Sequence, residues 1–261
     1  MNTPNNSLFT FLKAFLIVVL LAGIIVGLVF SVKKDDKLSG GAIVTNGIEC
    51  AAIGKSIVDA GGSVADVAVA TILCEGITCP QSSGLGGGFL LTIYIRSTDT
   101  LETLNAREVA PKLANSTMFV ADPSESVRGG KAVAVPGELK GLWELHQKYG
   151  KLPWAQLVEP NIKLAREGHI VSPYLVNIFA EAQTDLFGEP SLSEIYIDPR
   201  TNATYKLGDL IKRPKLAETL EIISKEGADS IYGGGSLAKG LIREIRDRGG
   251  IMTEEDLLDY Q

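Results

Sequence analysis

The sequence has few of the residues that carry metal chemistry or nucleic-acid binding. Among 261 residues there are two histidines and three cysteines, and the formal charge at neutral pH is -6. Two histidines leave almost no material for a Ser-His-Asp triad or a histidine-based metal site. The acidic balance supplies no basic field for a phosphate backbone. We therefore expect no metal, no cofactor and no nucleic-acid partner.

One long uncharged stretch, AFLIVVLLAGIIVGLVFSV, runs over residues 14–32. As a helix it would reach roughly 28 Å, close to the thickness of a bilayer core. A cleaved signal peptide is the main alternative, but its apolar region normally runs only about 7 to 15 residues. A buried soluble helix ranks third, because this stretch is apolar on every face. We expect a short tail over 1–13, a transmembrane signal anchor over 14–32, a linker over 33–40 and one domain over 41–261.

The orientation of this anchor is marked by conflicting signals. Three lysines follow the stretch and only Lys13 precedes it, so the positive-inside rule would place the domain in the cytoplasm. Two glycosylation sequons, at Asn115 and Asn202, have meaning only in the secretory lumen. The cysteines decide between these alternatives in favour of the lumen.

Two cysteines occupy matching positions in a predicted helical hairpin. Apolar spacing predicts a helix over 49–60, two glycines end it, and Ser63 with Asp66 predicts the capping box of a second helix. Cys50 and Cys74 lie equally far from Gly62 along the chain, so antiparallel helices would bring the thiols together. We predict a Cys50–Cys74 disulfide, which requires an oxidising compartment. The alternative is that both are small core residues.

The rest of the sequence predicts a mixed α/β domain. A short strand is expected over 41–45 and a β-hairpin over 89–95 and 101–106, with helices over 138–149, 154–167, 215–225 and 236–248. The glycine-rich segment 84–88 precedes a strand, whereas a dinucleotide-binding loop follows one. These glycines therefore indicate a close approach of other backbone rather than a phosphate site.

At the end of the predicted hairpin stands a motif that resembles the γ-glutamyl transferases, or glutathione hydrolases. It reads Asn105-Ala106-Arg107-Glu108-Val109-Ala110-Pro111. Further similar motifs are Gly61-Gly62-Ser63-Val64-Ala65-Asp66, Gly84-Leu85-Gly86-Gly87-Gly88-Phe89, Val135-Pro136-Gly137 and Gly249-Gly250-Ile251-Met252-Thr253-Glu254-Glu255-Asp256-Leu257. The resemblance spans about residues 40–261 and includes the anchor, the Cys50–Cys74 spacing being similar to a disulfide in some members. A second cysteine pair of some animal members, expected near residues 191–200, is missing.

The resemblance implies that Arg107 binds the α-carboxylate of the γ-glutamyl group. A guanidinium offers a planar fork of donors that can form two parallel, charge-assisted hydrogen bonds with a carboxylate. The alternative is that Arg107 forms an ordinary structural ion pair with Glu108.

The family is similar to N-terminal nucleophile hydrolases, which implies a four-layer αββα sandwich and a precursor that cuts itself. A threonine that opens the new small subunit attacks the γ-amide of glutathione, and the γ-glutamyl group passes to water, amino acids or peptides. We recognise none of the small-subunit motifs here. We therefore expect an incomplete sandwich without the catalytic nucleophile, inactive alone.

The implied partners are glutathione and other γ-glutamyl compounds, the missing small subunit of the same precursor, and the membrane through residues 14–32. The implied location is the plasma membrane, as a single-pass type II protein with the bulk of the chain extracellular. The alternative function is a catalytically inactive, membrane-anchored scaffold or binding protein with the same fold.

Overall fold

The computed structural model describes residues 41–261, of which Ile43–Gln261 form one compact unit. The expected tail, anchor and linker lie outside the described residues. Within the described range, no helix combines the length and the apolar character needed to cross a membrane.

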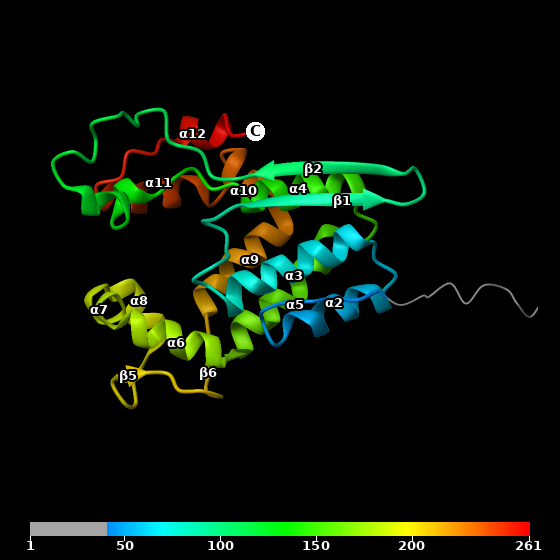
Figure 1. Ribbon diagram of the computed structural model, residues 1–261, viewed down its shortest axis with the longest axis horizontal. Helices are drawn as coiled ribbons and strands as arrows, with labels where there is room; N and C mark the ends of the chain where they lie inside the picture. The colour runs from blue at the N-terminus through cyan, green and yellow to red at the C-terminus, as the bar shows by residue number, and fades with distance from the viewer. Residues whose placement is uncertain (1–40) are drawn as a thin grey trace, which may run out of the picture. The chain divides into compact units, whose positions relative to one another are not determined.

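The predicted helical hairpin and its disulfide are both present. Helix α2 (Cys50–Asp59) and helix α3 (Val64–Thr78) are antiparallel neighbours (Figure 1). The α3 capping box forms as predicted: the Asp66 N–H donates to Ser63 Oγ at 3.1 Å, and the Ser63 N–H donates to Asp66 Oδ2 at 2.7 Å. Cys50 and Cys74 are fully buried and disulfide-bonded, with their Cα atoms 5.4 Å apart.

The strand predicted over 41–45 is wrong. No described strand lies beside this segment to form a ladder with it, and β-prone residues alone do not make a strand. The turn after it is held instead by a helix side chain, because the backbone N–H groups of Asn46 and Gly47 donate to Glu75 of α3.

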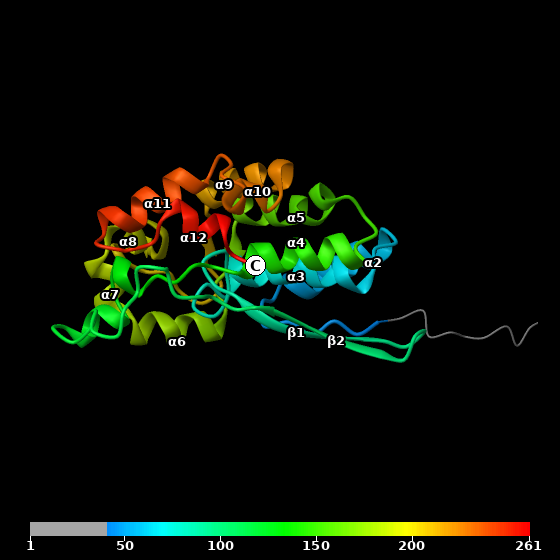
Figure 2. The ribbon, with the colours of Figure 1, turned by 90° about the horizontal axis from the view of Figure 1, so that it is seen from above.

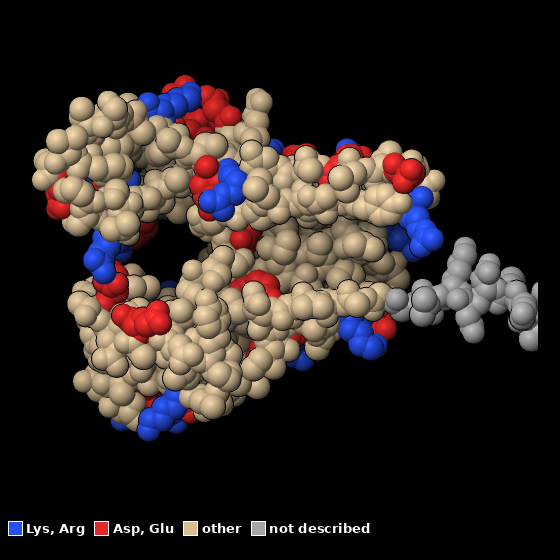
Figure 3. Space-filling model, in the orientation of Figure 1, with Lys and Arg blue, Asp and Glu red and all other residues tan. Residues whose placement is uncertain are grey.

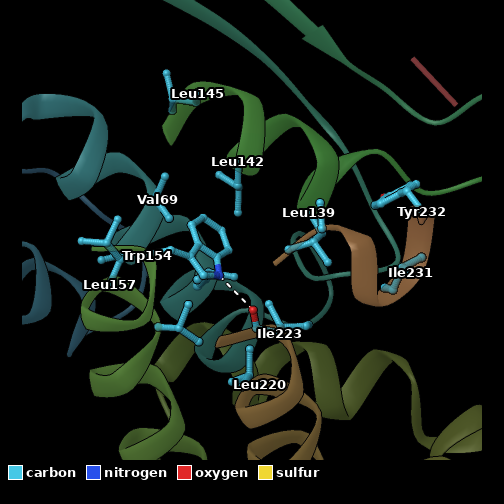
Figure 4. Close-up of a cluster of buried hydrophobic side chains, with 14 of the residues drawn as sticks. Val69, Leu139, Leu142, Leu145, Trp154, Leu157, Leu220, Ile223, Ile231 and Tyr232 are labelled. Carbon is cyan, nitrogen blue, oxygen red and sulfur yellow. Dashed lines mark hydrogen bonds between the residues drawn. The ribbon is translucent and has the colours of Figure 1, made fainter. Parts of the chain in front are cut away.

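Four helices form the main hydrophobic core. Helices α4 (Glu138–Tyr149) and α5 (Trp154–Glu167) pack on α3, and α9 (Pro214–Glu226) packs on α5. All three lie close to the predicted bounds. Trp154 lies at the centre of this cluster, and its indole Nε1–H donates to the Ile223 carbonyl oxygen at 2.9 Å (Figure 4). The indole therefore buries its apolar area without leaving its donor unpaired.

The predicted β-hairpin lies on the other side of α3 and α4 from α5 and α9 (Figure 2). Strands β1 (Phe89–Ile95) and β2 (Thr100–Ala106) are antiparallel, and their register runs from Ile95↔Thr100 at the turn to Phe89↔Ala106 at the open end. Phe89, Leu91 and Leu104 pack against the main core. The alternation of strand residues thus gives the hairpin one face that is fixed to the helices.

The part of the chain that connects α5 to α9 forms a second, smaller hydrophobic cluster. Its elements are short: α6 (Pro173–Glu181), α7 (Gln183–Gly188) and α8 (Pro190–Tyr196), with β3 (His169–Ile170) paired to β6 (Leu210–Ile211) and β4 (Ile197–Asp198) paired to β5 (Ala203–Thr204). The buried residues are Val171, Leu175, Phe179, Leu186, Tyr196, Ile197 and Ile211. The sequence patterns did not predict these elements.

A long connection leads from β2 to α4 and carries the 3-10 helices η1 (Pro123–Ser126) and η2 (Gly130–Ala132). The C-terminal helices α10 (Asp229–Tyr232), α11 (Ala238–Asp247) and α12 (Glu254–Leu258) lie along it. The Lys112 N–H donates to Asp256 Oδ1 at 2.8 Å, which ties the connection to α12. The described chain is a mixed α/β fold in which each sheet has two strands.

Candidate functional site

The candidate site is a cavity of about 560 Å³ between the two hydrophobic clusters. Its walls come from the glycine-rich segment before β1, from the residues after β2, from the start of α4 and from α8 and α9. Figure 3 shows this face of the molecule hollowed between the α11 and α8 regions. The glycine-rich segment 84–88 meets four charged residues there: Arg107, Glu108, Glu138 and Arg213.

Glu138, the first residue of α4, organises the glycine-rich segment. Its side chain is 2% exposed, and Oε2 accepts hydrogen bonds from the Gly84 N–H at 3.1 Å and from Ser83 Oγ at 3.2 Å. Burial raises the pKa of this carboxyl, and those two hydrogen bonds oppose the rise. The α4 N-terminus adds its own bonds, since the N–H groups of Gly137 and Glu138 both donate to the Gly87 carbonyl oxygen at 2.9 Å.

The sequence reasoning missed Glu138. An acidic residue in the first turn of a helix is ordinary, because it interacts favourably with the helix dipole, so nothing in the pattern distinguished it. Only the folded structure shows that the carboxylate points at backbone from a segment far away in sequence.

The glycines make the close approach that the sequence analysis predicted. A Cβ on Gly88 would lie 2.2 Å from the Ala106 carbonyl oxygen and 3.0 Å from the Arg107 Cα. Gly84 has a φ of +141°, which other residues rarely adopt. The segment therefore packs directly on the backbone at the end of β2, and side chains there would separate the two.

Arg107 lies at the rim of this cavity, immediately after β2. Its side chain is 57% exposed, and Nη2 lies 3.2 Å from Glu108 Oε2. The ion pair that was the structural alternative is thus present. An exposed pair of this kind contributes little to stability, and the guanidinium keeps further donors for a carboxylate. The observed contact is compatible with ligand binding by Arg107.

The two sequon asparagines lie at the surface, far from each other in sequence. Asn115 is exposed, and its Oδ1 accepts hydrogen bonds from the Thr117 N–H at 3.1 Å and from the Thr117 hydroxyl at 2.9 Å. Asn202 is exposed in the turn between β4 and β5 and has a φ of 51°. Both side chains can be reached from solvent, and glycosylation of either stays a prediction.

Neither histidine lines the candidate cavity. His146 Nε2 lies 2.8 Å from the Leu152 carbonyl oxygen. His169 is fully buried, and burial lowers its pKa. Among residues 41–261, no three His, Cys, Asp or Glu side chains are grouped to hold a metal ion. The free cysteine, Cys79, is buried, and burial together with the nearby Glu75 raises its thiol pKa to about 11.

Comparison with known proteins places these features in a family. The family model for gamma-glutamyltranspeptidase matches residues 50–261. The chain is 44% identical over 220 residues to scoloptoxin SSD14 of Scolopendra dehaani, covering 84% of this chain and 38% of that protein. It is 36% identical over 221 residues to glutathione hydrolase 3 of Arabidopsis thaliana, covering 85% of this chain and 34% of that protein.

Solved structures agree with this result. The gamma-glutamyltranspeptidase of Helicobacter pylori matches with a TM-score of 0.80 at 30% identity, over 87% of this chain and 65% of that chain. The enzyme of Pseudomonas nitroreducens, solved in complex with L-DON, matches with a TM-score of 0.77 at 35% identity, over 85% of this chain and 65% of that chain. The chain spans well under half the length of the curated relatives it matches. It belongs to the gamma-glutamyltranspeptidase family and corresponds to the N-terminal, large-subunit part.

Proposed function

We propose that this chain is the large-subunit part of an enzyme that cleaves the γ-glutamyl amide of glutathione and transfers the γ-glutamyl group to water, amino acids or peptides. In this proposal Arg107 binds the substrate α-carboxylate through two parallel hydrogen bonds. The observation that supports it most directly is the position of Arg107: a half-exposed guanidinium on the rim of a cavity, next to the glycine-rich segment.

The chain contributes binding and orientation, and a small subunit contributes the chemistry. A threonine hydroxyl at the start of that subunit attacks the γ-carbonyl, and its free α-amine serves as base. Anchoring the distal carboxylate fixes the direction of the γ-amide relative to that nucleophile, which lowers the entropic cost of the attack. The four-layer αββα sandwich would be completed by the same subunit, with the β1–β2 hairpin in one of its sheets. The likeness to the Helicobacter pylori enzyme supports this arrangement.

We further propose that the domain lies outside the cell, attached to the plasma membrane through residues 14–32 as a type II protein. Two observations support this location. The Cys50–Cys74 disulfide requires an oxidising compartment, and the side chains of both sequon asparagines are exposed to solvent.

The carboxylate role is tested by Arg107→Lys in the enzyme that pairs this chain with a threonine-initiated small subunit. Lysine keeps the charge but loses the planar fork, so KM for γ-glutamyl donors should rise by roughly tenfold or more while kcat changes little. The matched control is Arg96→Lys, because Arg96 is also exposed and lies at the far end of β1. An unchanged KM in Arg107→Lys would make Arg107 a structural residue.

The division between binding and chemistry is tested with the chain alone. Purified by itself, it should show no hydrolysis of a γ-glutamyl anilide. Steady turnover that follows the protein through purification would contradict the assignment of the nucleophile to another subunit.

A further inference from the structure

Arg107 is the first residue beyond the ladder of the β-hairpin. The last cross-strand pair is Phe89↔Ala106, so neither the amide nor the carbonyl of Arg107 has a strand partner. Two side chains replace the ladder. The Arg107 N–H donates to Asn105 Oδ1 at 3.1 Å, and the Arg107 carbonyl oxygen accepts a hydrogen bond from the Tyr260 hydroxyl at 2.7 Å. A backbone that would otherwise fray is therefore hydrogen-bonded on both sides.

The glycine-rich segment holds the same residue on a third side. A Cβ on Gly88 would lie only 3.0 Å from the Arg107 Cα, so the two backbones are in close contact. Glu138 in turn fixes the segment that carries Gly88. The main chain of Arg107 is thus held on three sides while its guanidinium stays half-exposed.

Tyr260 is itself firmly placed. Its side chain is 7% exposed and belongs to the main hydrophobic cluster, and its ring centroid lies 5.6 Å from that of Tyr232. A Cβ on Gly137 would lie 2.1 Å from the Tyr260 oxygen, so this hydroxyl reaches Arg107 through space that only glycine leaves open. Burial and the nearby charge of Glu108 raise the Tyr260 pKa, which keeps the phenol a donor.

We propose that Tyr260 is a positioning residue for the carboxylate site, and that its hydroxyl fixes the main chain of Arg107 in the conformation that binds substrate. The inference rests on the proposed role of Arg107. When the main chain of Arg107 is already fixed, the residue loses less conformational freedom on binding substrate, so the carboxylate is bound more tightly. Tyr260 does not touch the substrate and acts only through Arg107.

Tyr232 provides a matched control. Its side chain is 5% exposed in the same cluster, and its hydroxyl donates to the Pro136 carbonyl oxygen at 2.7 Å. Tyr260→Phe and Tyr232→Phe each remove one buried hydroxyl that bonds a backbone carbonyl. The two variants should lose similar stability, but only Tyr260→Phe removes a bond to Arg107.

The experiment compares both variants in the enzyme that pairs this chain with its small subunit. Tyr260→Phe should raise KM for γ-glutamyl donors by roughly three- to tenfold with kcat nearly unchanged, and Tyr232→Phe should leave KM at the starting value. In the Arg107→Lys background, Tyr260→Phe should raise KM no further, because both changes act on one contact. An unchanged KM in Tyr260→Phe, or an equal rise in both tyrosine variants, would overturn the inference.

A second measurement needs no catalysis. In the enzyme that pairs this chain with its small subunit, hydrogen exchange of peptides covering residues 105–109 should be faster in Tyr260→Phe than in Tyr232→Phe, and equal exchange would contradict the inference. The outcomes also separate the two proposals. If Arg107→Lys leaves KM unchanged, the carboxylate role fails; if it raises KM while Tyr260→Phe does not, only the role of Tyr260 fails.

Discussion

The two hydrophobic clusters are held together by different means. The main cluster is formed by helices of 12 to 15 residues, α3, α4, α5 and α9, whose apolar faces meet around Trp154. The second cluster is formed by α6, α7 and α8, of 9, 6 and 7 residues, and by strands of two residues. Helices this short have little stability of their own, so the second cluster depends on contacts rather than on local propensity.

The difference matters for the site, because the cavity lies between the clusters. Leu73, Ile77 and Leu220 of the main cluster line one part of it, and Leu192, Ile195 and Tyr196 of the second line another. Arg107 is attached to the main cluster through Tyr260. The cluster built from the longer helices therefore carries the proposed carboxylate anchor, and the other forms the facing wall.

Removing one aromatic side chain from each cluster tests whether the two clusters differ in stability. Trp154→Ala should destabilise the whole chain by about 3–5 kcal/mol, because it leaves a large cavity and removes one of the two hydrogen bonds that the Ile223 carbonyl oxygen accepts. Phe179→Ala, in the second cluster, should loosen mainly residues 171–211. Urea unfolding and hydrogen exchange measure the two effects.

If Phe179→Ala accelerated hydrogen exchange in α4 and α5 as much as in residues 171–211, the two clusters would unfold as one unit. The two clusters would then differ in the lengths of their elements but not in local stability.

The disulfide gives the next largest expected effect. Replacing Cys50 and Cys74 together by serine should cost about 3 kcal/mol, because the bridge no longer restricts the unfolded chain between α2 and α3. Exchange should rise in α2 and stay unchanged in α6 to α8. Cys79 serves as the internal control, since its burial and raised pKa predict slow alkylation in the native chain. Fast alkylation of Cys50 and Cys74 in the unreduced protein would contradict the disulfide.

The same difference explains how much the sequence could predict. Periodic apolar residues over 138–149 and 154–167 predicted helices whose ends match α4 and α5, and the symmetric cysteines predicted the bridge. Residues 173–196 form three short helices with turns between them, so no stretch is long enough to show a clear helical period. The strand over 41–45 was wrong because a strand needs a partner, which a local pattern cannot supply.

The sequence likewise indicated only some of the residues at the site. Arg107 could be proposed from the sequence because it lies in a recognisable motif at the end of a predicted hairpin, and its binding role stays a prediction. Glu138 and Tyr260 were missed because their hydrogen bonds join residues 54 and 153 positions apart in the chain. Nothing in the spacing of either residue indicates the partner, and in both of these bonds the partner is a backbone group, which carries no sequence signal.

The smallest expected effect concerns His169, which begins β3 at the junction of the clusters. Burial lowers its pKa below the ordinary 6.5, while the charge of Glu49 opposes this and that of Arg213 adds to it. The unfolded chain therefore binds a proton at a higher pH than the folded chain does. The stability from neutral His169 is fully present above pH 6.5 and is lost as pH falls through the folded pKa.

The test is urea unfolding at several pH values between about 5 and 7.5, with His169→Phe as the variant. Glu138 has a raised pKa and contributes a slope of opposite sign above its ordinary 4.5, so the difference between the two proteins is the quantity to measure. That difference should grow on acidification in favour of the variant, by about 1.4 kcal/mol for each tenfold weakening of proton binding in the folded state. Parallel pH profiles would mean that His169 binds its proton as tightly in the folded chain as in the unfolded chain, because water reaches the junction. The boundary between the clusters would then be more open than the buried imidazole suggests.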